Sequence, residues 1–137
     1  MAILLDTSLI VAAADAADIN HRAAVAWLGR VSEPLLIGAL TLGEVDHLLQ
    51  RELGPDATLA VIRSVTGGAI RLVPPTDADL RRASELMREA AEHRPRLAEA
   101  LLVAAAERLG ATRVGTFDRR PLAIFHPRHV RSLDLEP

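Results

Sequence analysis

The sequence predicts an α/β fold with a central, mainly parallel sheet, and three observations support this. Short apolar runs alternate with longer segments in which apolar residues recur at helical spacing. Helix-length stretches separate the apolar runs, and hairpin signals such as Asn-Gly are missing between them. Half of the 137 residues are hydrophobic, enough to bury one continuous core. We therefore expect residues 1–137 to form a single domain.

The first part of the chain predicts two strands and three helices. An apolar run at 2–5 is typical of a buried parallel strand. Apolar residues at helical spacing predict helices over 9–14 and 20–31. A second apolar run at 35–40 predicts the next strand. The pattern Thr-Leu-Gly-Glu then resembles a capping box that opens a helix over 41–53.

In the second part of the chain, predicted helices and strands continue to alternate. Gly-Pro-Asp predicts the start of a helix over 56–65, and two prolines end a strand at 69–73. A threonine caps an amphipathic helix over 77–93. A strongly apolar helix follows over 97–109 and is stopped by glycine. The remaining expected strands are 112–117 and a candidate fifth at 129–133.

Two missing residue types exclude much enzyme chemistry. The chain has no Cys, so it contains no disulfide, thiol nucleophile or thiolate zinc site. All sixteen basic residues are Arg, so a Walker A lysine, a Schiff base and a lysine general base are excluded as well. The N-terminal segment lacks a basic region before its apolar stretch, and no uncharged stretch approaches the roughly 20 residues of a membrane helix. We expect a cytoplasmic protein without a membrane partner.

Four acidic residues are expected at one edge of the sheet. Asp6 directly follows the first strand, and Asp118 follows the fourth. Glu44 lies one turn into the helix after the second strand, and Glu99 lies in the first turn of the apolar helix. Because functional groups gather at the carboxyl ends of parallel strands, these four have a route to one site. Clustered carboxylates suit hard cations, which activate water and stabilise charge on phosphate.

Each acid also has a structural interpretation. Asp6 is a possible helix N-cap, although burial at a strand end is costly for a carboxylate without partners. Glu44 completes the apparent capping box, and Glu99 suits the positive end of a helix dipole. Asp118 is compatible with an ordinary turn.

Four segments together resemble the PIN-domain family, in particular its VapC-type toxins. They are Leu4-Leu-Asp-Thr-Ser-Leu-Ile-Val11, Thr41-Leu-Gly-Glu-Val45, the segment 96–110 and Val114-Gly-Thr-Phe-Asp-Arg-Arg120. The resemblance covers essentially the whole chain, in order. It implies an α/β/α sandwich and an endoribonuclease that uses one or two Mg²⁺ ions. It also implies a homodimer held inactive by a small VapB-type antitoxin.

Particular residues can then be given expected roles in a metal-dependent nuclease. Asp6, Glu99 and Asp118 are expected to bind the metal, and Glu44 to hold a second ion or orient the attacking water. Hydroxyl groups expected to support these acids belong to Thr7, Ser8 and Thr116. Arginines expected to contact RNA phosphates, with surface charge neutralisation as the alternative, are Arg94, Arg96, Arg119 and Arg120.

Glu99 departs from the family pattern, which has Asp at this position. The additional methylene moves the carboxylate outward, and Mg²⁺ is sensitive to ligand geometry. We therefore expect weaker metal binding, a preference for Mn²⁺, or dependence on substrate phosphate to complete the site. Glu99 also keeps a second hypothesis open, a PIN-like module that binds RNA or protein with little or no catalysis. A phosphorylated-aspartate mechanism is disfavoured because those families need a lysine near the phosphoryl group.

Overall fold

The computed structural model describes residues 1–137 and contains a five-stranded sheet in the order β3-β2-β1-β4-β5. Every neighbouring pair of strands is parallel. The strands are β1 (Ile3–Leu5), β2 (Leu35–Gly38), β3 (Ile70–Val73), β4 (Arg113–Gly115) and β5 (Asp134–Glu136). The predicted α/β class with a parallel sheet is confirmed.

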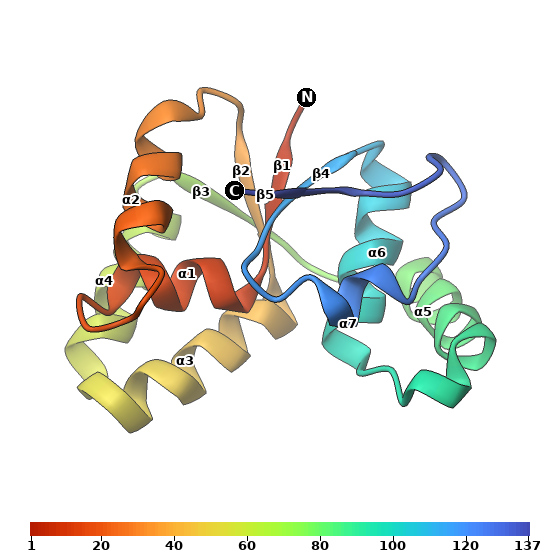
Figure 1. Cartoon of the computed structure of the whole chain (residues 1–137), viewed down its shortest axis with the longest axis horizontal. Helices are drawn as coiled ribbons and strands as arrows, with labels where there is room; N and C mark the ends of the chain where they lie inside the picture. Colours follow the sequence, from red (N-terminus) through yellow and green to blue (C-terminus); the bar gives the residue numbers. More distant parts are fainter.

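Helices cover both faces of this sheet (Figure 1). The first group comprises α1 (Thr7–Ala14), α2 (His21–Arg30), α3 (Ala39–Leu53) and α4 (Pro55–Thr66). The second group comprises α5 (Asp77–Glu89), α6 (Leu97–Leu109) and the short α7 (Arg120–Ala123), with a 3₁₀ turn at Ala91–His93 after α5. The result is the α/β/α sandwich that the sequence predicts.

Two hydrophobic cores lie on opposite faces of β1. Ile3 and Leu5 pack with Trp27 and the helices α1 to α4. Leu4, which points the other way, packs with Val103 and the helices α5 to α7. Successive residues of a strand face opposite sides of the sheet, so a strand buried on both faces is apolar throughout. This explains the continuous apolar run that precedes Asp6.

Gly115 at the end of β4 is required by the close approach of Trp27. A Cβ atom at this position would lie 2.8 Å from the Trp27 ring, which is too close for any side chain. The Trp27 Nε1–H donates a hydrogen bond of 3.0 Å to Glu136 Oε1, and Glu136 also pairs with Arg113. These contacts bind α2, β4 and β5 to one another.

The start of α3 differs from the prediction. The helix begins at Ala39, with Gly38 as its N-cap, so Thr41 lies inside the helix. No side-chain cap hydrogen bond is present at this end, and the predicted capping box is therefore wrong. Gly38 has extended backbone angles, and its successor already follows helical geometry. The carboxylate of Glu44 is consequently free of a capping role.

Three other boundaries are corrected. Helix α4 has Pro55 in its first turn after the N-cap Gly54, so Asp56 is not the cap. The helix predicted over 77–93 leaves α geometry at Ala90 and ends in the 3₁₀ turn. The fifth strand occupies Asp134–Glu136 instead of 129–133. His129 in that stretch contacts the carbonyl oxygen of Ala111 at 2.6 Å, which holds the stretch as a loop.

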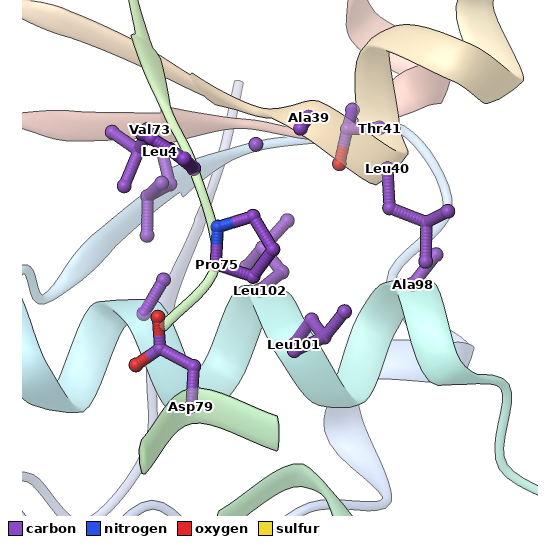
Figure 2. A pocket seen from close by; sticks show the side chains of 13 residues that line it. Leu4, Ala39, Leu40, Thr41, Val73, Pro75, Asp79, Ala98, Leu101 and Leu102 are labelled. Carbon is purple, nitrogen blue, oxygen red and sulfur yellow. The ribbon is translucent and has the colours of Figure 1, made fainter. Parts of the chain in front are cut away.

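An apolar pocket separates the start of α3 from α6 (Figure 2). Leu40, Pro75 and Leu101 line it, and Asp79 of α5 lies at its edge. None of the helices combines the length and apolar character needed to cross a lipid bilayer.

Asp79 joins α5 to α6 through a buried ion pair. Its side chain is 3% exposed and accepts hydrogen bonds of 2.9 Å from Arg108 Nε and Nη2. Asp79 and Thr76 also form the predicted cap of α5 as a reciprocal capping box. Although burial raises the pKa of Asp79, the hydrogen bonds from Arg108 and Thr76 outweigh it and lower the pKa overall.

We expect Asp79→Asn to lower the free energy of unfolding by roughly 1–3 kcal/mol at pH 7, because Arg108 loses its charged partner. A carboxyl whose folded-state pKa is lowered stabilises the protein above its unfolded pKa, near 3.8, and this stability is lost as pH falls through the folded-state value. Urea unfolding between pH 7 and pH 2 should therefore show the variant and wild type converging in acid. Asp77→Asn, an exposed change in the same helical turn, is the control. A difference that does not change with pH would contradict this interpretation.

Candidate active site

The register of β1 and β4 brings two distant segments together. Leu5 lies opposite Gly115, so Asp6 and Thr116 leave the sheet at neighbouring positions. The Asp6 N–H donates to the Gly115 carbonyl oxygen at 2.9 Å. This hydrogen bond extends the pairing one residue beyond the strands and places Asp6 beside the loop that carries Asp118.

Asp6 is buried at the carboxyl end of β1, with 7% of its surface exposed. It occupies the N-cap position of α1, but its side chain makes no capping hydrogen bond. Instead, Thr116 Oγ1 donates to Asp6 Oδ2 at 2.7 Å. Burial raises the pKa of Asp6, and the hydrogen bond from Thr116 opposes the rise only in part. The carboxylate is thus held in position at an electrostatic penalty.

Ser8 fixes the loop of Asp118 to α1. Its Oγ accepts hydrogen bonds from the N–H groups of Phe117 at 2.9 Å and Asp118 at 3.2 Å. The same hydroxyl lies 3.1 Å from Thr116 Oγ1. Asp118 itself is exposed, so its carboxylate is accessible at the rim of the site.

Glu44 has a partner on each carboxylate oxygen. Thr7 Oγ1 donates to Oε2 at 3.1 Å, and Arg96 Nη2 donates to Oε1 at 2.6 Å. The Glu44 side chain is 24% exposed and that of Arg96 is 67% exposed, so this ion pair lies at the mouth of the site. Thr7, Ser8 and Thr116 thus each form a hydrogen bond with one of the acidic residues or with the Asp118 loop.

Of the two buried acids of the site, Glu99 has fewer hydrogen-bond partners than Asp6. Glu99 lies in the first turn of α6, is 7% exposed, and its buried Oε2 has no hydrogen-bond partner. Burial raises the pKa of Glu99, and the charges of Glu44 and Asp6 add to the rise, while Arg96 opposes it. Glu99 is therefore not a surface residue that is favoured only by the helix dipole.

All four predicted acids line one cleft with a volume of about 550 Å³. Thr7 and Ser8 line it as well, and Arg96 is the one predicted arginine that does so. Arg119 instead donates to the Pro137 carbonyl oxygen at 2.7 Å, and Arg94 is exposed elsewhere. No three acidic or histidine side chains converge closely enough to hold a metal ion between them.

The donor set nevertheless fits a hard cation. Asp6, Glu99, Glu44 and Asp118 offer only carboxylate oxygens, which Mg²⁺ and Mn²⁺ prefer. The unpartnered Glu99 Oε2 and the raised pKa values of Asp6 and Glu99 indicate that positive charge is lacking where these side chains are buried. A cation between them would relieve the repulsion that keeps the carboxylates apart.

Three polar residues of the cleft were not identified as site residues from the sequence. Asp18 and Asn20 belong to the connection between α1 and α2, and His47 lies on α3. His47 has one sequence signal, its position three residues after Glu44 on the same helix, which places both on one face. The connection offers no comparable pattern.

The sequence model of the PIN-domain family matches residues 3–125. The chain belongs to the PIN-domain family. This PIN domain is 30% identical over 124 residues to the ribonuclease VapC26 of Mycobacterium tuberculosis, covering 90% of this chain and 92% of the relative. The predicted family is confirmed.

Solved structures share this PIN-domain fold. The crystal structure of VapC20 of Mycobacterium tuberculosis, described as a toxin that cleaves the sarcin-ricin loop, has a TM-score of 0.83 at 25% identity, covering 94% of this chain and 98% of VapC20. The structure of VapBC2 from Rickettsia felis, bound to a promoter DNA fragment, has a TM-score of 0.71 at 14% identity and covers 99% and 98% of the two chains. The second likeness concerns the fold alone.

We expect Asp6→Asn and Glu99→Gln each to raise the melting temperature of the metal-free PIN domain by a few degrees at pH 7. A carboxyl with a raised folded-state pKa destabilises the fold when ionised, and the penalty vanishes as pH falls below the unfolded values near 3.8 and 4.5. Thermal unfolding in EDTA at pH 7 and pH 4 measures this. Mn²⁺ should raise the melting temperature of wild type and not of the variants. A lower melting temperature for both variants in EDTA would contradict the assigned penalty.

Proposed function

We propose that this PIN domain, residues 1–137, is a metal-dependent endoribonuclease and the toxin of a toxin–antitoxin pair. The main support is a cleft that gathers four carboxylates, two of them buried and one with an unpartnered oxygen. Such a site needs a cation, and its natural use is phosphodiester hydrolysis. The name of VapC26 and the description of VapC20 support RNA as the substrate.

In this proposal Asp6, Glu99 and Asp118 hold Mg²⁺ or Mn²⁺, directly or through water. The bound ion would lower the pKa of water and neutralise charge that develops on the phosphate. Glu44 would orient the attacking water or help to hold a second ion. Thr116 fixes the Asp6 carboxylate through its 2.7 Å hydrogen bond, so that Asp6 is preorganised.

Ser8 and Arg96 would prepare the site for substrate in different ways. Ser8 ties the Phe117 and Asp118 N–H groups to α1, which limits the motion of the Asp118 loop. Arg96 pairs with Glu44 at the mouth of the cleft, where it can also grip an RNA phosphate. The products would be a 5′-phosphate and a 3′-hydroxyl.

A catalytically weak module that binds RNA or protein is the second candidate. Two observations favour it: Glu99 replaces the Asp of the family pattern, and no three acids are drawn together around one point. In the first candidate, binding of metal and RNA draws the acids together. The two candidates differ in whether RNA is cut, and the nuclease assay below distinguishes them.

Partners are also part of the proposal. A small VapB-type antitoxin and a homodimer follow from the resemblance to VapC-type toxins, and a cytoplasmic location is part of the proposal. Support for self-association comes from the apolar pocket of Figure 2, whose rim carries Leu40, 41% exposed.

We expect Asp6→Asn to reduce cleavage of single-stranded RNA by about a hundredfold or more, the loss typical for removal of one charged catalytic group. The assay compares Mg²⁺, Mn²⁺ and EDTA and maps the cleaved ends. Asp56→Asn, in the first turn of α4, is the matched control and should retain wild-type activity. Equal RNA decay for wild type and Asp6→Asn in every metal would refute the nuclease and leave the binding module.

We expect Arg96→Gln to weaken RNA binding and make its salt dependence shallower. Loss of one phosphate contact on a single strand lowers the slope of log K against log salt by about 0.7. Fluorescence anisotropy between 50 and 300 mM salt (roughly the range over which screening changes most) provides the measurement. Arg94→Gln, also exposed but outside the cleft, should leave the slope unchanged. If both variants behave like wild type, Arg96 is only a partner of Glu44.

A further inference from the structure

The cleft is also lined by residues other than the four acids and the residues that support them. These residues come from α1, from the connection between α1 and α2, and from α3, and we treat them as one end of the cleft. We call this end the distal pocket and define it by Val11, Asp18, Asn20, Gly43, His47 and Leu48. None of these residues has a role in the hydrolysis described above.

The wall formed by the connection is held in place by hydrogen bonds within the chain. Asp18 Oδ1 accepts from the Asn20 N–H at 2.8 Å, and the Asp18 N–H donates to the Asp15 carbonyl oxygen at 3.0 Å. His21 Nδ1 lies 2.8 Å from the Ala12 carbonyl oxygen, which fixes the end of the connection to α1. The wall is therefore preorganised before any ligand arrives.

The polar groups on the two walls are free. The Asn20 amide and the His47 ring make no hydrogen bond to any other residue, and Asp18 uses one carboxylate oxygen for its turn and keeps the other. An amide, an imidazole and a carboxylate oxygen together present both donors and acceptors. The aliphatic side chains of Val11 and Leu48 line the same space.

Gly43 lines the distal pocket without a side chain. It lies inside α3, where glycine destabilises a helix by about 1 kcal/mol relative to alanine. A Cβ atom at Gly43 would meet nothing within 4 Å, so packing does not demand glycine here. Gly43 precedes Glu44 and lies one turn before His47, so it links the acids with the distal pocket.

We propose that the distal pocket binds one unstacked nucleobase of single-stranded RNA next to the scissile phosphate, and this rests on the proposed ribonuclease function. A base has flat apolar faces and an edge of donors and acceptors, and proteins read such bases by stacking and by edge hydrogen bonds. His47 offers a stacking face, Val11 and Leu48 offer aliphatic contact, and Asn20 reads the edge.

The charged side chains of the cleft favour the phosphate and the base of a nucleotide at different places. Arg96 lies at the end of the cleft that contains the acids, whereas the distal pocket has the carboxylate of Asp18 and no arginine. A carboxylate repels phosphate and accepts hydrogen bonds from amino groups, as Asp and Glu do with the amino group of cytosine. The distal pocket therefore prefers a base with an exocyclic amino group, adenine, cytosine or guanine, over uracil.

The test uses four labelled homohexamers, of adenylate, cytidylate, guanylate and uridylate, titrated against the Asp6→Asn protein in Mg²⁺ by anisotropy. We expect at least one amino-bearing hexamer to bind about fivefold or more tightly than the uridylate hexamer. Asp18→Asn and Asn20→Ala should reduce that preference to about twofold or less. His47→Ala should weaken all four, because stacking is tolerant of base identity.

Two kinds of control keep the result independent of folding. Gly43→Leu fills the pocket and favours the helix, so it should bind every hexamer more weakly while its melting temperature is unchanged or higher. His93→Ala and Asp56→Asn remove the same side-chain types outside the cleft and should match the parent protein. The same distal substitutions, made in the catalytically intact protein, should change the base found beside the cut in a random-sequence RNA.

The outcomes separate the two proposals. Asp6-dependent cleavage with equal hexamer affinities and an unchanged cut profile in all distal variants would overturn the distal pocket and leave the ribonuclease intact. A base preference that depends on Asp18, in a protein that cuts no RNA in any metal, would show base binding by the pocket but refute the ribonuclease and with it a place beside a scissile phosphate. Absence of both the preference and the cleavage would overturn both.

Discussion

The site depends on the hydrogen-bonded pairing of β1 with β4. These strands are formed by residues more than a hundred positions apart, and their register is carried one residue further by the contact of Asp6 with Gly115. Only with this register does Thr116 reach the Asp6 carboxylate, and only then does Ser8 hold the loop of Asp118. The close approach of Trp27 to Gly115 supports the same register from the helical side.

The acids of the site differ in the partners that balance their negative charge. Glu44 has an arginine and a hydroxyl, Asp6 has the hydroxyls of Thr116 and Ser8 but no positive charge, and Glu99 has a buried oxygen without any partner. Burial without a counter-charge is unfavourable, so the fold retains Asp6 and Glu99 at a loss of stability. Such a loss is common where function requires a group in a particular place.

Much of this arrangement can be predicted from sequence, for identifiable reasons. Asp6 and Asp118 each follow an apolar strand. The carboxyl ends of parallel strands meet at one edge of the sheet in any fold of this class, so both residues are expected there. The Thr76 cap and the glycine after α6 are local signals that no tertiary contact overrides. Local patterns failed at Thr41, where the cap pattern is present but the chain is already helical at Ala39.

Other features depend on three-dimensional placement that residue spacing does not encode. The α1–α2 connection has no periodicity, so Asp18 and Asn20 reach the cleft only through the packing of those helices. Arg96 and Arg94 are equivalent in sequence, two arginines around one proline, yet only Arg96 contacts Glu44. Arg94 has a left-handed backbone with φ of 51°, which turns the chain between them.

The last strand has an effect beyond closing the sheet. The Thr116 N–H donates a hydrogen bond to the Glu136 carbonyl oxygen, and the Arg119 side chain donates one to the carbonyl oxygen of Pro137. Residues 134–137 therefore contact the Asp118 loop on both sides of Asp118. A peptide fused after position 137, or a cut within this strand, would thus act on the loop even though both changes lie far from it in sequence.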